Sequence, residues 1–203
     1  MIHAVFEDLI NGTFKRSNYK EKFTDNALDK IKEVFDDLRS TYDFVMSEAM
    51  LCDTEHGIAG TADLIVRNKK TGEYELLDFK TKMVTYNKTK KNKKGKNLYG
   101  FFYVDSTKHG LNTTRLGYDF QLTAYQHMLE KLGIKISRRA IVPLAVDVNN
   151  DKISNVYVSK MFGKQAEEDA KHGTYEIKQN KQVLYDVKHK VFGQTEGFGI
   201  DVT

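Results

Sequence analysis

The chain is poor in cysteine, proline and tryptophan. Its 203 residues include one cysteine, Cys52, one proline, Pro143, and no tryptophan. With a single cysteine, the chain forms no internal disulfide and holds no cysteine-rich zinc or iron–sulfur site of its own. We therefore expect a reducing, cytoplasmic environment.

Long hydrophobic runs are also missing. No stretch of about 18 uncharged apolar residues is present, and no basic start followed by an apolar segment and a small-residue cleavage site. We expect a soluble protein that is neither exported nor bound to a membrane. With 40% hydrophobic and 30% charged residues, the length suits one sizeable core and is short for two. We therefore predict a single domain over residues 1–203.

Acidic residues are absent from Phe79 to Val104, where eight lysines lie. They are Lys80, Lys82, Lys88, Lys90, Lys91, Lys93, Lys94 and Lys96. Because the net charge of the whole chain is +4, the remainder carries a net negative charge. A local basic block on an otherwise acidic chain indicates binding to a polyanion. A solvated lysine loop or a localisation signal is the alternative interpretation.

Apolar residues recur at helical spacing in several stretches. Helices are predicted at His3–Ile10, Ala27–Leu38, Tyr118–Leu132 and Gln165–Lys171. Thr24 or Asp25 is placed to cap the second helix, and Gly133 to end the third. The segment 182–192 fits either a strand or a helix.

Shorter apolar stretches bounded by polar turns predict strands. These are Asp43–Cys52, Gly60–Arg67, Glu73–Thr81, Leu98–Val104, Ala140–Val148 and Lys152–Ser159. The polar segments 68–72 and 149–151 suit hairpin loops. The pattern predicts a mixed α/β fold with a central sheet built largely from hairpins.

Two aspartates, Asp63 and Asp78, lie inside predicted strands that are otherwise apolar. If a four-residue loop joins these strands, the two carboxylates face each other on one side of the sheet. A five-residue loop sends them to opposite faces, because a one-residue slip inverts the side chains of a strand. Lys80 shares the face of Asp78 by strand alternation.

Two facing carboxylates repel each other, and burying them is costly unless a cation compensates. A divalent metal bound by both supplies that compensation, and oxygen ligands suit Mg²⁺ or Mn²⁺. In the alternative interpretation, Asp63 is a turn residue at the start of its strand. Asp78 and Lys80 then form an ordinary ion pair at a strand end.

The order of these residues resembles the metal site of the PD-(D/E)XK nuclease superfamily. The segments GTAD (60–63) and LDFK (77–80), separated by a strand and a hairpin loop, follow its pattern, with Gly-x-x-Asp before the hairpin as in the RecB-like branch. Gln121 and Tyr125 resemble the Q-x-x-x-Y motif of that branch, and their spacing places them on one helix face. Taken alone, this pair also fits the surface and core edge of an ordinary helix.

Two further positions fit the resemblance. Glu48 lies where RecB-like nucleases carry a glutamate ahead of Gly-x-x-Asp, although an exposed charge on a strand is the alternative. His3 resembles a metal-binding histidine of the first helix of the branch, where it follows G-x-x. Because this chain begins two residues before His3, we expect either a piece of a longer protein or a shortened first helix.

The resemblance implies a restriction-endonuclease-like core, a central mixed β-sheet flanked by helices, that hydrolyses DNA phosphodiester bonds. One or two Mg²⁺ or Mn²⁺ ions would be held by Asp63, Asp78, the main-chain carbonyl of Phe79, Glu48 and His3. Lys80 would orient or deprotonate the attacking water, or stabilise developing charge. With only Cys52, the chain resembles members without an iron–sulfur cluster, such as phage and mitochondrial genome-maintenance exonucleases.

The resemblance also implies contacts with nucleic acid. Gln121 and Tyr125 would meet it beside the scissile phosphate, and the lysines from Lys82 to Lys96 would hold its backbone. The aromatic residues between Leu98 and Val104 would stack on unpaired bases, or they form a buried strand. These residues are Tyr99, Phe101, Phe102 and Tyr103.

We therefore predict a metal-dependent deoxyribonuclease, and more specifically an exonuclease on DNA ends or single strands. It would act in recombination, repair or replication beside the proteins of those processes. A structure-specific or RNA endonuclease and a nucleic-acid-binding module without turnover are the alternatives. The sequence carries no serine-hydrolase elbow, zinc-protease helix, Walker A loop or dinucleotide-binding glycine pattern. His56, beside Gly57, is predicted to be a turn residue.

Overall fold

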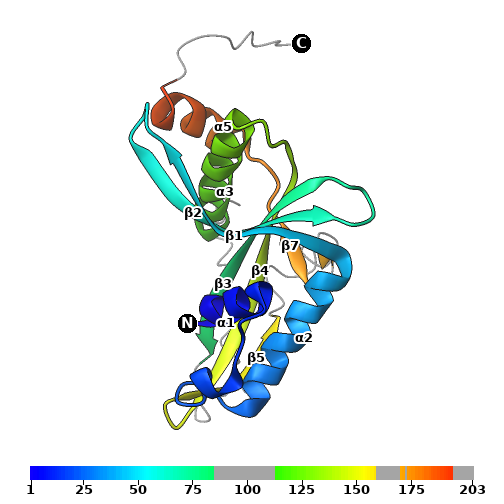
Figure 1. Ribbon diagram of the computed structural model, residues 1–203. Helices are drawn as coiled ribbons and strands as arrows, with labels where there is room; N and C mark the ends of the chain where they lie inside the picture. The colour runs from blue at the N-terminus through cyan, green and yellow to red at the C-terminus, as the bar shows by residue number, and fades with distance from the viewer. Residues whose placement is uncertain (85–112, 159–169, 172, 194–203) are drawn as a thin grey trace.

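A computed structural model describes residues 1–84, 113–158, 170–171 and 173–193, in which helices flank a seven-stranded β-sheet (Figure 1). The helices are α1 (Ile2–Asn11), the 3₁₀-helix η1 (Arg16–Tyr19), α2 (Asp25–Thr41), α3 (Thr113–Lys131), α5 (Lys181–Asp186) and the π-helix η2 (Val187–Val191). The strands are β1 (Tyr42–Asp53), β2 (Ile58–Asn68), β3 (Tyr74–Val84), β4 (Ile136–Asn149), β5 (Lys152–Val158), β6 (Ala170–Lys171) and β7 (Thr174–Glu176). The predicted fold class, mixed α/β with a central mixed sheet flanked by helices, is confirmed.

Hairpins and a parallel crossover build the sheet. Its spatial order is β1-β2-β3-β4-β7-β6, and β5 pairs with β4 off this path. The pairs β1–β2, β2–β3 and β4–β5 are antiparallel, whereas β3 and β4 run parallel. Parallel neighbours need a long connection, and α3 lies within the connection from β3 to β4.

The β2–β3 hairpin has the register that a four-residue loop gives. Leu64 pairs with Leu77, Arg67 pairs with Tyr74, and the Asn68 N–H donates to the Glu73 carbonyl at 2.8 Å. The five-residue alternative is therefore wrong. In the observed register, Asp63 is the next residue of β2 beyond the last regular pair, on the side toward Asp78.

Alternation along the strands divides the apolar residues between two cores on opposite faces of the sheet. Leu64 and Leu77 pack with residues of α1 and α2. Ile65 and Leu76 pack with residues of α3 and α5. The helices therefore lie in two layers, and the strands that carry Asp63 and Asp78 run between them (Figure 1).

The helix ends follow the local signals in the sequence. Of the two candidate caps, Thr24 is the N-cap of α2, and its hydroxyl accepts the Ala27 N–H at 3.3 Å. Gly12 follows α1 with φ of 70°, a left-handed conformation that glycine adopts without steric cost. The first three predicted helices are confirmed: the first two have somewhat wider bounds, and the third begins five residues earlier and ends one residue earlier than predicted.

The C-terminal third contains two short strands that the sequence did not predict, β6 and β7. Ala170–Lys171, predicted as the end of a helix, instead form strand β6, which pairs with β7 through Lys171 and Thr174. Gly173 at φ 72° supports the reversal between these short strands. The rest of that predicted helix, and the predicted strand Leu98–Val104, lie outside the described residues. The segment 182–192, left open as strand or helix, contains α5 and η2.

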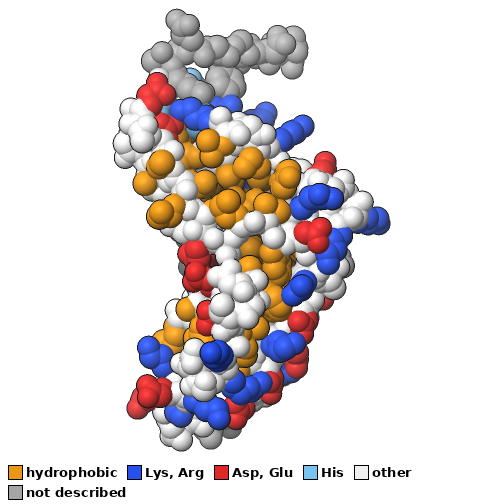
Figure 2. All heavy atoms as spheres, in the orientation of Figure 1, with side chains coloured by type: hydrophobic (Ala, Val, Ile, Leu, Met, Phe, Trp, Pro, Cys, Tyr) orange, Lys and Arg blue, Asp and Glu red, His pale blue; other side chains and the backbone are white. Residues whose placement is uncertain are grey.

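The surface shown in Figure 2 is uneven in polarity. Hydrophobic side chains gather over the upper part of the molecule, where β1, β2 and α3 lie in Figure 1. Charged side chains line α2, where they form the pairs Lys30–Glu33 and Lys32–Asp36. None of the helices in the described part of the chain is both long and apolar enough to cross a membrane.

Candidate metal centre

Three of the predicted metal ligands meet where α1, β1 and β2 come together. His3, Glu48 and Asp63 each offer a ligand atom, and these atoms lie within 4.8 Å of one another. His3 Nδ1 is 3.9 Å from Asp63 Oδ2. Asp78 lies outside this group of three. The structure thus brings together residues from separate helices and strands that only the resemblance connected.

Strands β2 and β3 separate at Asp63. Their regular pairing ends at Leu64 and Leu77, and beyond this point Asp63 Oδ2 accepts the Phe79 N–H at 2.7 Å. The carboxylate thus replaces a backbone acceptor in the ladder. The Phe79 ring stacks on Phe6 of α1 at a centroid distance of 4.3 Å, which fixes this opening of the sheet against α1.

Glu48 has an unusual backbone conformation. Its neighbours Ser47 and Ala49 pair with Leu64 and Ala62, so Glu48 lies opposite Asp63 across β1 and β2. Its φ of 46° is uncommon for a residue other than glycine. Such strained residues are concentrated at functional sites.

Asp78 and Lys80 form a buried ion pair on one face of β3, as alternation predicted. Lys80 Nζ lies 2.6 Å from Asp78 Oδ2, and only 3% of the Asp78 side chain is exposed. Apart from this ion pair, Asp78 Oδ2 has no hydrogen-bond partner among the described residues. This oxygen could therefore bind a further cation, such as a metal ion.

The two residues of the Q-x-x-x-Y motif bind each other, and Gln121 also binds Lys80. Gln121 Oε1 accepts a hydrogen bond from Lys80 Nζ at 2.9 Å, and Gln121 Nε2 donates to the Tyr125 hydroxyl at 3.2 Å. The two residues share one face of α3, as their spacing predicted. Contact between them and nucleic acid stays a prediction.

Gly60, the first residue of the GTAD segment, allows α3 to approach β2 closely. A Cβ atom at this position would lie 2.5 Å from Cε1 of Tyr125. No real Cβ tolerates such a contact, so the tyrosine of one motif packs in the space left by the glycine of the other. The two sequence motifs are therefore joined by direct packing.

Acidic side chains are crowded together at this candidate metal centre. Burial, followed by the nearby charge of Asp78, raises the pKa of Asp63 to about 6, although His3 and the Phe79 N–H oppose the shift. Burial likewise raises the pKa of Asp78 against the opposing charge of Lys80. Crowded carboxylates of this kind favour either a proton or a metal cation.

The donor set fits a divalent metal ion. Carboxylate oxygens suit Mg²⁺ and Mn²⁺, and an imidazole nitrogen is compatible with Mn²⁺. His3, Glu48 and Asp63 have suitable mutual spacing, and Asp78 presents its buried oxygen nearby on the adjacent strand. This cluster could therefore bind metal.

A second cluster of possible metal ligands is already paired with a lysine side chain. Asp53, Glu55 and His56 also present ligand atoms within 4.8 Å of one another, but Lys131 Nζ lies 2.6 Å from Asp53 Oδ2. The Lys131 hydrogen bond lowers the pKa of Asp53. His56 lies in the turn between β1 and β2, as predicted, and its backbone N–H and Nδ1 both contact Asp53 Oδ1.

Of the lysines predicted to contact nucleic acid, only Lys82 belongs to a described element. The backbone of Lys82 belongs to β3. Lys88, Lys90, Lys91, Lys93, Lys94 and Lys96 lie outside the described residues, as do Tyr99, Phe101, Phe102 and Tyr103. Their roles toward nucleic acid stay predictions.

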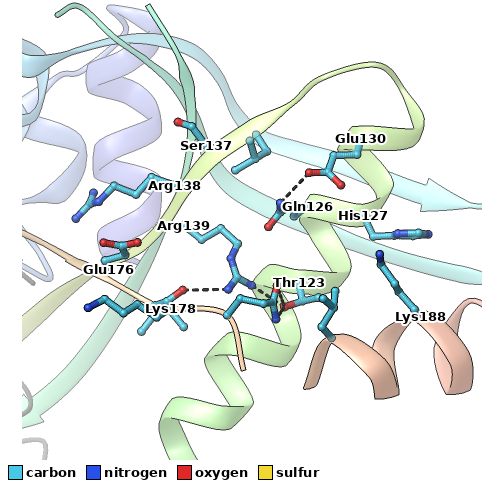
Figure 3. A pocket seen from close by; sticks show the side chains of 14 residues that line it. Thr123, Gln126, His127, Glu130, Ser137, Arg138, Arg139, Glu176, Lys178 and Lys188 are labelled. Atoms are coloured by element: carbon cyan, nitrogen blue, oxygen red, sulfur yellow. Dashed lines mark hydrogen bonds between the residues drawn. The ribbon is translucent and has the colours of Figure 1, made fainter. Parts of the chain in front are cut away.

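A buried ion pair that the sequence did not signal anchors α3 to the sheet. Arg139 of β4 binds Asp119 Oδ1 at 2.9 Å and Thr123 Oγ1 at 2.6 Å, and it also donates to the Ile177 carbonyl. Figure 3 shows Arg139 reaching toward α3 and Arg138 lying on the other side of the strand. Arg139, Thr123 and Ile177 border a cavity of about 360 Å³, on the side of α3 that carries Thr123 and Gln126. Asp119 and Gln121 lie in the same turn of α3, so the ion pair holds the turn that carries Gln121 against the sheet.

Tyr118 is a residue of the centre that the motif comparison missed. Its ring centroid lies 5.1 Å from Lys80 Nζ. Its spacing from Gln121, one helical turn, was the only signal that could have identified it. Burial and the charge of Asp78 raise the pKa of its hydroxyl.

Comparisons with known proteins find a structural match and no match to a family model or curated protein. No protein-family model and no curated protein matches the chain. Among solved structures, the chain is similar to the crystal structure of a putative exonuclease from Eubacterium rectale, with 13% sequence identity and a TM-score of 0.39. The match covers 94% of this chain and 62% of that one, so the chain spans less than two thirds of the length of that protein. A likeness this distant assigns neither family nor activity.

Proposed function

We propose that this protein is a divalent-metal-dependent nuclease that hydrolyses DNA phosphodiester bonds, acting as an exonuclease on DNA ends or single strands. The observation that carries the proposal is the convergence of four elements. Helix α1, strand β1 and strand β2 supply His3, Glu48 and Asp63 within ligand distance, and β3 supplies the buried pair Asp78–Lys80. The resemblance to PD-(D/E)XK nucleases had joined these same residues from sequence alone.

Each side chain has a role consistent with this chemistry. His3, Glu48, Asp63 and Asp78 would hold Mg²⁺ or Mn²⁺. When bound, such an ion activates a water nucleophile and offsets the negative charge that develops on the phosphate. Lys80 lies beside the acidic centre with an ammonium that can orient the nucleophile or stabilise that charge. Gln121 keeps the ammonium in place through its 2.9 Å hydrogen bond.

The decisive test compares a linear DNA with a closed circle. End-labelled linear DNA and a single-stranded circle are incubated with the protein in Mg²⁺, in Mn²⁺ and in EDTA. We expect metal-dependent loss of the linear substrate alone, and no cleavage by Asp78→Asn. The matched control is Asp43→Asn, which changes an aspartate on β1 whose side chain is 58% exposed and should cleave normally.

Other outcomes separate the alternatives. Cutting of the circle would favour an endonuclease, and cleavage of RNA in preference to DNA would change the substrate class. Full activity of Asp78→Asn would remove this centre from the reaction. Retained DNA binding with no cleavage under any condition would support a binding module.

A further inference from the structure

Lys80 makes three contacts that define the position of its ammonium. Its Nζ pairs with Asp78 Oδ2 at 2.6 Å, donates to Gln121 Oε1 at 2.9 Å, and lies 5.1 Å from the centroid of the Tyr118 ring. The first contact comes from the same strand, and the other two come from α3. A cation at this distance from an aromatic ring is attracted by the negative charge of the ring face.

A lysine needs such contacts to be held in place. Its long stem is flexible and its ammonium is strongly hydrated in water, and 21% of the Lys80 side chain is exposed. Tyr118, by contrast, is fixed, because it packs against the apolar core between the sheet and α3. The ring therefore provides a rigid surface beside a mobile group.

The spacing of the helix explains how one element provides both contacts. Tyr118 and Gln121 are one turn apart and share a face of α3. Asp119 lies between them in sequence, and its buried ion pair with Arg139 attaches this turn of the helix to β4. Any shift of the turn would move the ring and the amide together.

We propose that Tyr118 is a positioning residue that holds the Lys80 ammonium at the acidic centre through the face of its ring. The catalytic consequence rests on the proposed nuclease function, whereas the placement of Lys80 does not. The ring is the important feature, so phenylalanine should replace tyrosine and an aliphatic residue should not.

Nuclear magnetic resonance tests the placement without any catalytic assay. Protons held over an aromatic face are shifted upfield, so the Lys80 ε-methylene resonance should be displaced from those of exposed lysines. Its assignment follows from its disappearance in Lys80→Met. The displacement should persist in Tyr118→Phe and be lost in Tyr118→Leu. An unshifted resonance in the wild-type protein would overturn the proposal.

Single-turnover cleavage at saturating DNA tests the consequence. Tyr118→Leu should be about tenfold slower, the loss expected of a partly desolvated cation–π contact, with the Mg²⁺ dependence unchanged. Tyr118→Phe should match the wild type. Phe120→Leu is the matched control, because Phe120 lies on the same helix but is 41% exposed. In a Lys80→Met background, Tyr118→Leu should cause no further loss, because the two residues act together.

The two measurements separate the two proposals. A wild-type protein that shows the shifted resonance but cleaves no DNA would refute the nuclease function and support the placement of Lys80. A shifted resonance combined with a normal rate in Tyr118→Leu would overturn the positioning role. An equal loss in Phe120→Leu would also overturn it, because a general effect on α3 would then explain both.

Discussion

At the scale of single residues, Asp63 combines a structural and a chemical task. One of its oxygens closes the gap where β2 leaves β3, by accepting the Phe79 N–H. The same carboxylate lies within ligand distance of His3 and Glu48. Since the hydrogen bond to Phe79 needs only an oxygen acceptor, an asparagine can preserve it while removing the charge. The two tasks can therefore be separated by substitution.

The raised pKa of Asp63 predicts how stability depends on pH in the absence of metal. The folded-state pKa is about 6, above the value of about 3.9 for an unfolded chain. Between these values the folded protein binds a proton that the unfolded chain does not. The stabilising effect is therefore fully present below the unfolded pKa and is lost as the pH rises through about 6.

We expect the protein in EDTA to lose up to about 3 kcal/mol of unfolding free energy from this group between pH 4 and pH 7. Asp63→Asn should remove that part of the pH dependence and be the more stable protein at pH 7. Urea unfolding at several pH values measures both effects, with Asp43→Asn as the exposed control. Identical pH profiles for wild type and Asp63→Asn would contradict the assignment of the shift to Asp63.

Single residues also mark the limit of prediction from sequence. Asp63, Asp78 and Lys80 could be identified because each is a charge inside an apolar strand. The positive φ of Glu48 could not, since it depends on how β1 meets β2. The pairing of Arg139 with Asp119 could not either. Arg138 and Arg139 look equivalent in sequence, and only the orientation of β4 sends one toward Glu75 and the other toward α3.

At the scale of elements, the hairpin was predictable and its interruption was not. Loop length and side-chain alternation determine the pairing of β2 with β3, and the observed register follows them. The separation of the strands after Leu64 has a different origin. It arises because a side-chain carboxylate replaces a backbone acceptor, which requires α1 to support Phe79 from the other side. Such a tertiary effect leaves no periodic pattern in the sequence.

The contact of Gly60 with Tyr125 predicts a strong coupling between β2 and α3. Gly60→Ala places a methyl group 2.5 Å from the tyrosine ring, and overpacking of this kind costs about 1–3 kcal/mol. In a Tyr125→Ala background the same change should cost little, because the ring is gone. Unfolding free energies of the four proteins in a double-mutant cycle measure this coupling.

Gly117→Ala provides the matched control for that cycle. Gly117 lies on α3, and a Cβ there would meet nothing within 4 Å. This change should stabilise the helix by about 0.5–1 kcal/mol, the usual gain from replacing a helical glycine. If Gly60→Ala were equally harmless, α3 would not depend on the glycine for its approach to the sheet.

At the scale of the whole molecule, the centre lies where two layers meet across one sheet. The core with α1 and α2 contains Phe79, whose ring lies beside that of His3, on one face. The core with α3 and α5 supports Tyr118 and Tyr125 from the other. His3 therefore reaches the centre from the layer of α1, whereas Gln121, the partner of Lys80, reaches it from the layer of α3. Both layers must be assembled before the site exists, so its formation should accompany folding of the entire sheet.

Charge distribution over the whole chain predicts how DNA binding depends on salt. The lysines at positions 90 to 96 are Lys90, Lys91, Lys93, Lys94 and Lys96, and the chain without its basic block has net negative charge. Each lysine that neutralises a phosphate adds about 0.7 to the slope of log affinity against log salt for single strands and about 0.9 for duplexes. Replacing all five by alanine should therefore reduce that slope by up to about 4.

The measurement uses Asp78→Asn, so that DNA is bound without being cleaved, across a range of KCl concentrations. A charge-matched control removes the same number of lysines elsewhere, at Lys15, Lys20, Lys22, Lys30 and Lys32. Both variants have the same net charge, so a general loss of attraction would lower their affinities equally. A smaller slope only in the first variant would assign phosphate contacts to the basic block. Equal slopes would leave that block as a solvated loop, and the electrostatic attraction for DNA would then have to come from the rest of the surface.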